Sequence, residues 1–153
     1  MSFTVIVVAI STDAVGKRYA PATYAVGREK IREYALAVGE TNPLHLDVAR
    51  ARRKGYRDVV APPMFCVVYC GPALGPVMFD PEVGIDFARL LHSAQEFRWG
   101  PLVIAGDEIA TTMTVKDISA RGEMGFYTFE SVSTNQDGAT VCVGTWSNIV
   151  RGA

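Results

Sequence analysis

The sequence has little of several features that would define its chemistry directly. Its 153 residues include three cysteines and two histidines, and its net charge is −1. A charge balance this even disfavours nucleic acid as a partner, because a phosphate backbone is bound by a strongly basic surface. Cys66, Cys70 and Cys142 are too few for a disulfide framework and lack metal-ligand spacing. We therefore expect no metal ion and a reducing, cytoplasmic setting.

Long uninterrupted apolar runs are also missing. Residues 62–79 are apolar, but glycines and prolines interrupt them, whereas a membrane-spanning helix needs about 20 apolar residues. Residues 2–10 lack the basic start and small-residue cleavage pattern of a signal peptide. We expect no membrane contact and one domain over residues 1–153, in which residues 1–10 form an N-terminal extension without an assignable role.

The first half of the sequence has helical periodicity. Ile31, Tyr34, Ala35 and Val38 recur at helical spacing, which predicts a helix over residues 28–38 that ends at Gly39. A short second helix is predicted over residues 48–54, with Asp47 as its N-cap. Residues 64–70 are apolar on every face, which predicts a helix buried on all sides. Pro72 is expected to break or bend this helix.

The second half is typical of strands. Ile109, Thr111, Met113 and Val115 alternate with more polar neighbours, and residues 126–134 and 140–150 are rich in β-branched and aromatic side chains. Turn signals at 105–107, 121–123 and 135–138 separate these runs, which predicts an antiparallel sheet. With a short strand near Tyr24, we predict an α+β fold in which a curled sheet wraps the apolar helix.

The segment "GETNPLH", residues 39–45, carries the candidate chemistry. A carboxylate and an imidazole can share acid and base work near neutral pH, which makes Glu40 and His45 the candidates for proton transfer. Glu40 is predicted just past a helix C-terminus, where the negative dipole should raise its pKa. The alternative is an ordinary polar loop, in which Glu40 is exposed, Asn42 forms a turn and His45 only packs.

The same segment resembles the signature of the MaoC-like, (R)-specific enoyl-thioester hydratases, which have the hotdog fold. The stretches "GYRDVVAPPMF", "IDFARLLHSAQEF" and "PLVIAGDEI" are similar to single-hotdog actinobacterial dehydratase subunits of the HadA type. The resemblance extends from about residue 15 to the end. It implies reversible hydration of trans-2-enoyl thioesters to (R)-3-hydroxyacyl thioesters, carried on coenzyme A or acyl carrier protein, with no cofactor.

The resemblance also implies roles for individual residues. Glu40 and His45 match the catalytic pair, and Asn42, Pro63 and Met64 match positions near the substrate. Two departures stand out. Glu40 replaces the usual Asp, and Pro62-Pro63 replaces a His-Gly pair whose glycine N–H holds the thioester oxygen. Because proline has no N–H, the N–H of Met64 is the expected substitute.

Three functions remain open from the sequence. The first is a hydro-lyase, the second is a non-catalytic subunit that binds an acyl chain beside an active partner, and the third is a hotdog thioesterase. The hotdog resemblance implies a dimer, either with a second copy or with a homologous subunit. Arg52, Arg53 and Lys54 are candidate contacts for the phosphates of coenzyme A or for acyl carrier protein; the alternative is a solvated helix face.

Overall fold

The computed structural model of the protein describes residues 10–152, so nearly all of the expected N-terminal extension lies outside the described residues. The elements, in chain order, are β1 (Ala22–Ala25), α1 (Arg28–Ala37), α2 (Pro43–Leu46), α3 (Val48–Arg53), the 3-10 turn η1 (Pro63–Phe65), α4 (Cys66–Met78), the 3-10 turn η2 (Phe87–Arg89), β2 (Leu90–Trp99), β3 (Glu108–Arg121), β4 (Met124–Thr134) and β5 (Thr140–Arg151).

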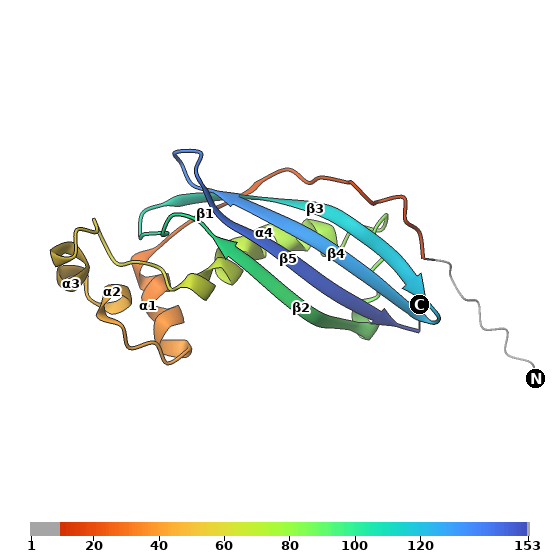
Figure 1. The fold of residues 1–153 in the computed structure, drawn as a ribbon, viewed down its shortest axis with the longest axis horizontal. Helices are drawn as coiled ribbons and strands as arrows, with labels where there is room; N and C mark the ends of the chain where they lie inside the picture. Colours follow the sequence, from red (N-terminus) through yellow and green to blue (C-terminus); the bar gives the residue numbers. More distant parts are fainter. Residues whose placement is uncertain (1–9, 153) are drawn as a thin grey trace, which may run out of the picture.

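The strands form one antiparallel sheet in the order β1-β3-β4-β5-β2. The sheet curls over α4, which lies behind it in Figure 1. This arrangement confirms the predicted α+β fold with a sheet around a central helix. The connections explain it: three long strands joined by tight turns must pair as neighbours, and the face that they bury needs an apolar element against it.

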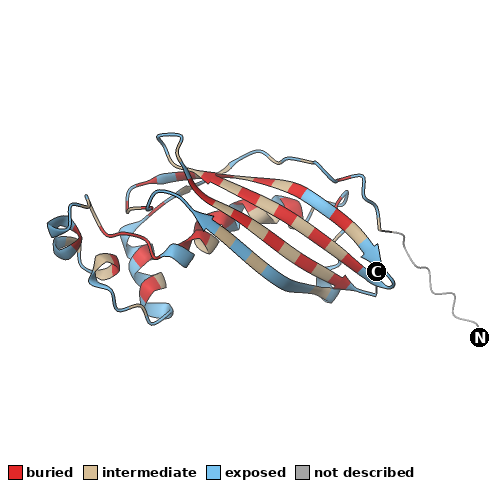
Figure 2. Ribbon diagram, viewed as in Figure 1, coloured by how far each residue is buried: buried red, intermediate tan, exposed pale blue. Residues whose placement is uncertain are grey.

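The long strands bury alternate residues, as their sequence pattern predicts. In β3, Ile109, Thr111, Met113 and Val115 are all fully buried, while the residues between them are partly exposed. Figure 2 shows the same alternation along β4 and β5. Since successive strand residues point to opposite faces, one face of the sheet packs on α4, where Phe65 and Phe129 belong to the core.

The central helix differs from the prediction in two ways. It continues to Met78 through Pro72 and Pro76, and it is not buried on all sides, because both prolines are exposed. Each proline follows a glycine, whose missing Cβ removes part of the clash that normally excludes an α-helical residue before proline. On this exposed face, water can also satisfy the carbonyls that lose their N–H partners.

The helices α1, α2 and α3 gather at one end of the sheet, next to the start of α4 (Figure 1). Gly39 ends α1 with φ +72°, as predicted. The Asp47 side chain accepts a hydrogen bond from the Arg50 N–H and so caps α3, also as predicted. These short-range signals bring residues 40–47 to the N-terminal end of α4.

Strand β2 is an edge of the sheet and is far more exposed than β3, β4 or β5 (Figure 2). One side of β2 pairs with β5, and its exposed apolar residues include Leu91 and Trp99. Among the helices of residues 10–152, none is long and apolar enough to cross a membrane.

Candidate functional site

The loop after α1 is built by its own side chains. The Asn42 carboxamide oxygen accepts a hydrogen bond from the Leu44 N–H at 3.1 Å, which makes Asn42 the N-cap of α2. Pro43 follows at the first helical position, where its fixed φ suits a helix and its missing N–H costs nothing. This single turn of helix carries His45 inward. Asn42, expected near the substrate, therefore has a structural role in shaping the loop.

His45 is buried, with 7% of its surface exposed. Its Nδ1 lies 2.6 Å from the carbonyl oxygen of Val60. Because a carbonyl oxygen only accepts hydrogen bonds, Nδ1 carries a proton, and in the neutral ring the lone pair is on Nε2. The imidazole is thus held in one tautomer, with Nε2 able to accept a proton.

The pKa of Glu40 shifts in the direction opposite to the predicted one. Its Oε1 accepts hydrogen bonds from the N–H groups of Asn42 and Thr41, both at 2.9 Å. The bond from Asn42 is the main cause that lowers the pKa of Glu40; partial burial opposes it, while the Thr41 bond and the proximity of His45 add to it. The predicted rise was wrong because direct hydrogen bonds to the charged carboxylate outweigh a helix dipole.

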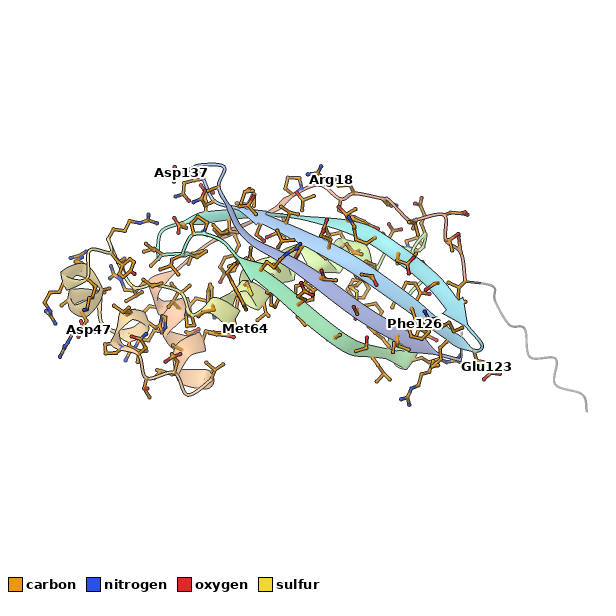
Figure 3. All side chains as sticks on the ribbon, viewed as in Figure 1. Arg18, Asp47, Met64, Glu123, Phe126 and Asp137 are labelled. Atoms are coloured by element: carbon orange, nitrogen blue, oxygen red, sulfur yellow. The ribbon has the colours of Figure 1, made fainter. Side chains whose placement is uncertain are left out.

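The start of the central helix holds the other two predicted substrate positions. Pro63 and Met64 begin η1, and both are exposed. Figure 3 shows Met64 at the end of α4 that faces the α1–α3 cluster. The first N–H groups of a helix have no partner within it, and the N–H of Met64 is one of these groups. The Pro63 carbonyl accepts a hydrogen bond from Trp99 Nε1 at 2.8 Å.

An apolar cavity of about 380 Å³ opens beside Pro63. It lies between the helix start, the end of β2 and the start of β5. Its walls include Tyr69, Trp99, Leu102 and Val141. Trp99 and Leu102 are each about half exposed, at 52% and 53%. A cavity lined in this way can take a hydrocarbon chain of moderate length.

The basic residues divide into two groups. Arg52, Arg53 and Lys54 are exposed at the C-terminal end of α3, which fits the alternative of a solvated helix face. A second cavity, of about 260 Å³, is lined by His45 together with Arg28 and Arg32 of α1. Within residues 10–152, no group of three or more His, Cys, Asp or Glu side chains lies close enough to hold a metal ion.

Sequence reasoning missed three residues around this site. Val60 supplies the acceptor for His45, and its backbone role leaves no signal in the residue type. Trp99 lines the apolar cavity; it was one of several aromatic residues for which the core, a dimer interface and an acyl tunnel were all open from the sequence. Asp107, interpreted as a turn residue, is buried and accepts hydrogen bonds from Arg57 and Gln136. The flanking Gly106 and Glu108 are exposed, so the sequence around Asp107 carries no local signal of its burial.

Comparison with known sequences identifies the family. Residues 13–143 match the family described as "FAS1-like, dehydratase domain region". The chain belongs to this family. A UPF0336 protein of Clavibacter michiganensis is 42% identical over 133 residues, which cover 87% of this chain and 89% of the relative. A UPF0336 protein of Saccharopolyspora erythraea is 40% identical over 139 residues, which cover 90% and 89%.

Solved structures agree with this assignment. The HadBC (3R-hydroxyacyl-ACP dehydratase) complex of Mycobacterium tuberculosis matches with a TM-score of 0.76 and 26% identity, over 90% of this chain and 98% of that chain. A MaoC-like dehydratase matches with a TM-score of 0.80 and 28% identity, over 92% of this chain and 43% of that one. The R-hydratase PhaJ1 of Pseudomonas aeruginosa, at 19% identity and a TM-score of 0.68, shares the fold. The predicted hotdog, MaoC-like assignment is confirmed.

Proposed function

We propose that this protein is a hydro-lyase that adds water reversibly to trans-2-enoyl thioesters, giving (R)-3-hydroxyacyl thioesters on coenzyme A or acyl carrier protein. The observation that carries the proposal is the buried His45 ring, held by Val60 in the tautomer that leaves Nε2 as the acceptor. This base lies five residues from an ionised carboxylate, in a family of dehydratase domains.

The proposed reaction uses one water between the two groups. Oε1 of Glu40 is engaged by backbone N–H groups, so Oε2 is the oxygen that we assign to the water. His45 Nε2 takes one proton while the water oxygen bonds to C3, and the same proton is returned at C2. Because the lowered pKa of Glu40 keeps it charged, Glu40 orients the water and stabilises the imidazolium, and His45 carries the proton.

The helix start supplies the remaining part of the proposal. Negative charge develops on the thioester oxygen when C3 is attacked, and an N–H at the positive end of a helix stabilises such charge. Met64 offers that N–H, and the apolar cavity beside Pro63 would take the acyl chain. The reaction proposed in this way needs no cofactor.

The proposed assembly is a dimer of hotdog domains, formed by two copies or with a homologous partner. The support is the exposed edge strand β2, whose unpaired side offers backbone groups to another strand. The HadBC neighbour is itself a complex, and so is the ChsH1-ChsH2 complex of Mycobacterium tuberculosis, which shares the fold with a TM-score of 0.69.

A second candidate is an acyl-binding subunit whose partner supplies the chemistry. The observation that favours it is the Pro62-Pro63 pair, because Pro63 has no N–H where the family's glycine provides one. Loss of one such donor costs about 10²–10³-fold in rate. The thioesterase alternative has no specific contact in its favour.

Purified protein tests the proposal directly with crotonyl-CoA, whose enoyl absorbance should fall as water adds. His45→Ala should abolish the reaction, whereas His92→Ala should retain it, because His92 is exposed and packs edge-on against Trp146. If the protein alone does not hydrate crotonyl-CoA and a homologous subunit restores the activity, the result would favour the binding-subunit alternative. Release of free thiol from a saturated acyl-CoA would instead identify a thioesterase.

A further inference from the structure

We infer that two ion pairs outside the reacting groups, Arg57–Asp107 and Arg28–Asp58, position the His45 imidazole by holding the backbone of Val60. This inference rests on the proposed function for its catalytic meaning, but the geometry it concerns can be measured without any substrate. Asp107 and Asp58 are positioning residues in this scheme, because both act through the chain segment 57–61.

Val60 holds the catalytic turn at two points. Its carbonyl oxygen accepts the Nδ1–H of His45 at 2.6 Å, and its N–H donates to the Leu44 carbonyl at 2.9 Å. The orientation of the imidazole and the position of the α2 backbone therefore both depend on Val60. A shift of Val60 would move the Nε2 of His45 with it.

Val60 is itself held by a short antiparallel ladder. Ala61 N–H donates to the Val103 carbonyl at 2.8 Å, and Ala105 N–H donates to the Val59 carbonyl at 3.0 Å, on either side of a bridge between Val60 and Ile104. This ladder is too short to be stable alone. Its register needs support from side chains.

Asp107 supplies that support across the ladder. Its Oδ1 accepts hydrogen bonds from the Arg57 guanidinium at 2.5 Å and from Gln136 Nε2 at 2.9 Å, and its Oδ2 accepts the Ile104 N–H at 2.7 Å. One buried carboxylate thus joins the first residue of the 57–61 segment to the centre of the opposing strand. Only 5% of its side chain is exposed, so water competes little for these bonds.

Asp58 connects the same segment to α1. Its Oδ1 accepts the Val59 N–H at 2.8 Å and Arg28 Nε at 2.9 Å, and its Oδ2 accepts from the other end of the guanidinium at 2.5 Å. This bidentate pair fixes both distance and angle. Since Glu40 follows the C-terminal end of α1, the pair also sets where the helix that leads into Glu40 lies relative to the segment that holds His45.

The test is the tautomer of His45, read from the ¹⁵N chemical shifts of the imidazole in the full-length protein. Two histidines are present, and His92→Gln assigns the signals. In the unaltered protein, the neutral ring should be protonated at Nδ1. Asp107→Asn has one acceptor oxygen in place of two and cannot accept from the Ile104 N–H as well as from Arg57 and Gln136, and Arg28→Gln loses the bidentate pair. Each should give a mixture of tautomers and faster exchange of the Nδ1 proton.

Asp80→Asn is the matched control. Asp80 is a comparably bonded carboxylate, which accepts from Tyr19 Oη and pairs with Lys17, but it lies beyond the other end of α4. It should leave the His45 signals unchanged. Arg57→Lys keeps a positive charge beside Asp107, and its His45 signals should remain close to those of the unaltered protein. If folded Asp107→Asn and Arg28→Gln proteins keep the unaltered tautomer, the inference is wrong, whatever their activity.

Kinetics then distinguish this inference from the proposed function. Where the unaltered protein hydrates crotonyl-CoA, Asp107→Asn should lower kcat about 10- to 100-fold with little change in KM, because misplacing a reacting group costs rate more than binding. An inactive unaltered protein with the expected tautomer shifts would refute the proposed function and leave the positioning network in place. A raised KM in Asp107→Asn, with kcat and the His45 tautomer both unchanged, would refute the network.

Discussion

The indole Nε1–H of Trp99, at the end of β2, donates to the carbonyl oxygen of Pro63, at the start of η1, over 2.8 Å. This bond joins the edge of the sheet to the beginning of the central helix. It also places the Trp99 ring in the wall of the apolar cavity. The size of that cavity therefore depends on a contact between two residues that are 36 positions apart in the sequence.

Truncation of Trp99 should change chain-length preference. Trp99→Ala enlarges the cavity, and we expect the ratio of kcat/KM for a C8 enoyl-CoA to that for crotonyl-CoA to rise about 10-fold, since pocket contacts with methylenes discriminate by about 10- to 200-fold. Trp99→Phe keeps a ring but loses the bond to Pro63, and it should change the ratio much less. An unchanged ratio in Trp99→Ala would show that the chain binds elsewhere.

Pro63 should limit the rate if thioester activation occurs at the helix start. Pro63→Gly adds an N–H where the family's glycine has one, and we expect kcat for crotonyl-CoA hydration to rise about 10-fold or more. The same change should lower Tm, because proline at a first helical position restricts the unfolded chain. An unchanged kcat together with a lower Tm would mean that the Met64 N–H stabilises the thioester oxygen fully and that a second donor at position 63 adds nothing.

Removing the charge of Glu40 should affect the activity of the protein much more than its thermal stability. Glu40→Gln retains a carbonyl oxygen that can accept the N–H groups of Thr41 and Asn42, so Tm should move little. Loss of the negative charge should lower kcat about 100-fold, because the imidazolium loses its partner. Glu40→Asp, the family's usual residue, should remain active. Full activity in Glu40→Gln would remove the carboxylate from the proposed reaction.

Acid should destabilise the protein through two carboxylates. Arg28 lowers the pKa of Asp58 to about 2, and Lys17 with Tyr19 lowers that of Asp80 to about 2. In the unfolded chain the pKa of each carboxyl is ~4. The two groups therefore stabilise the folded state above pH ~4, and this stability is lost as the pH falls towards 2. Thermal unfolding between pH 7 and 3 should show this fall, and Asp80→Asn should make it shallower. Equal slopes would contradict the assignment.

Much of this protein is determined by local patterns in its sequence. The alternation in β3, the turns at Gly106, Gly122 and Gly138 with positive φ, and the Asp47 cap all follow from residues within a few positions of one another. The spacing of Glu40 and His45 is equally local, so the candidate loop could be named without coordinates. The extent of α4 could not be predicted in this way. The helix continues through Pro72 because this residue lies on an exposed face, and the packing of the folded chain decides which face is exposed.

Tertiary structure decided what the candidate residues do. The helix dipole suggested a raised pKa for Glu40, whereas the folded loop turns two backbone N–H groups onto Oε1 and lowers it. The tautomer of His45 depends on Val60, 15 positions away, and the anchoring of that segment depends on Asp107, 50 positions from Arg57. Periodicity and turn chemistry act between neighbours in sequence, while proton position and charge respond to whichever groups the fold brings within about 3 Å.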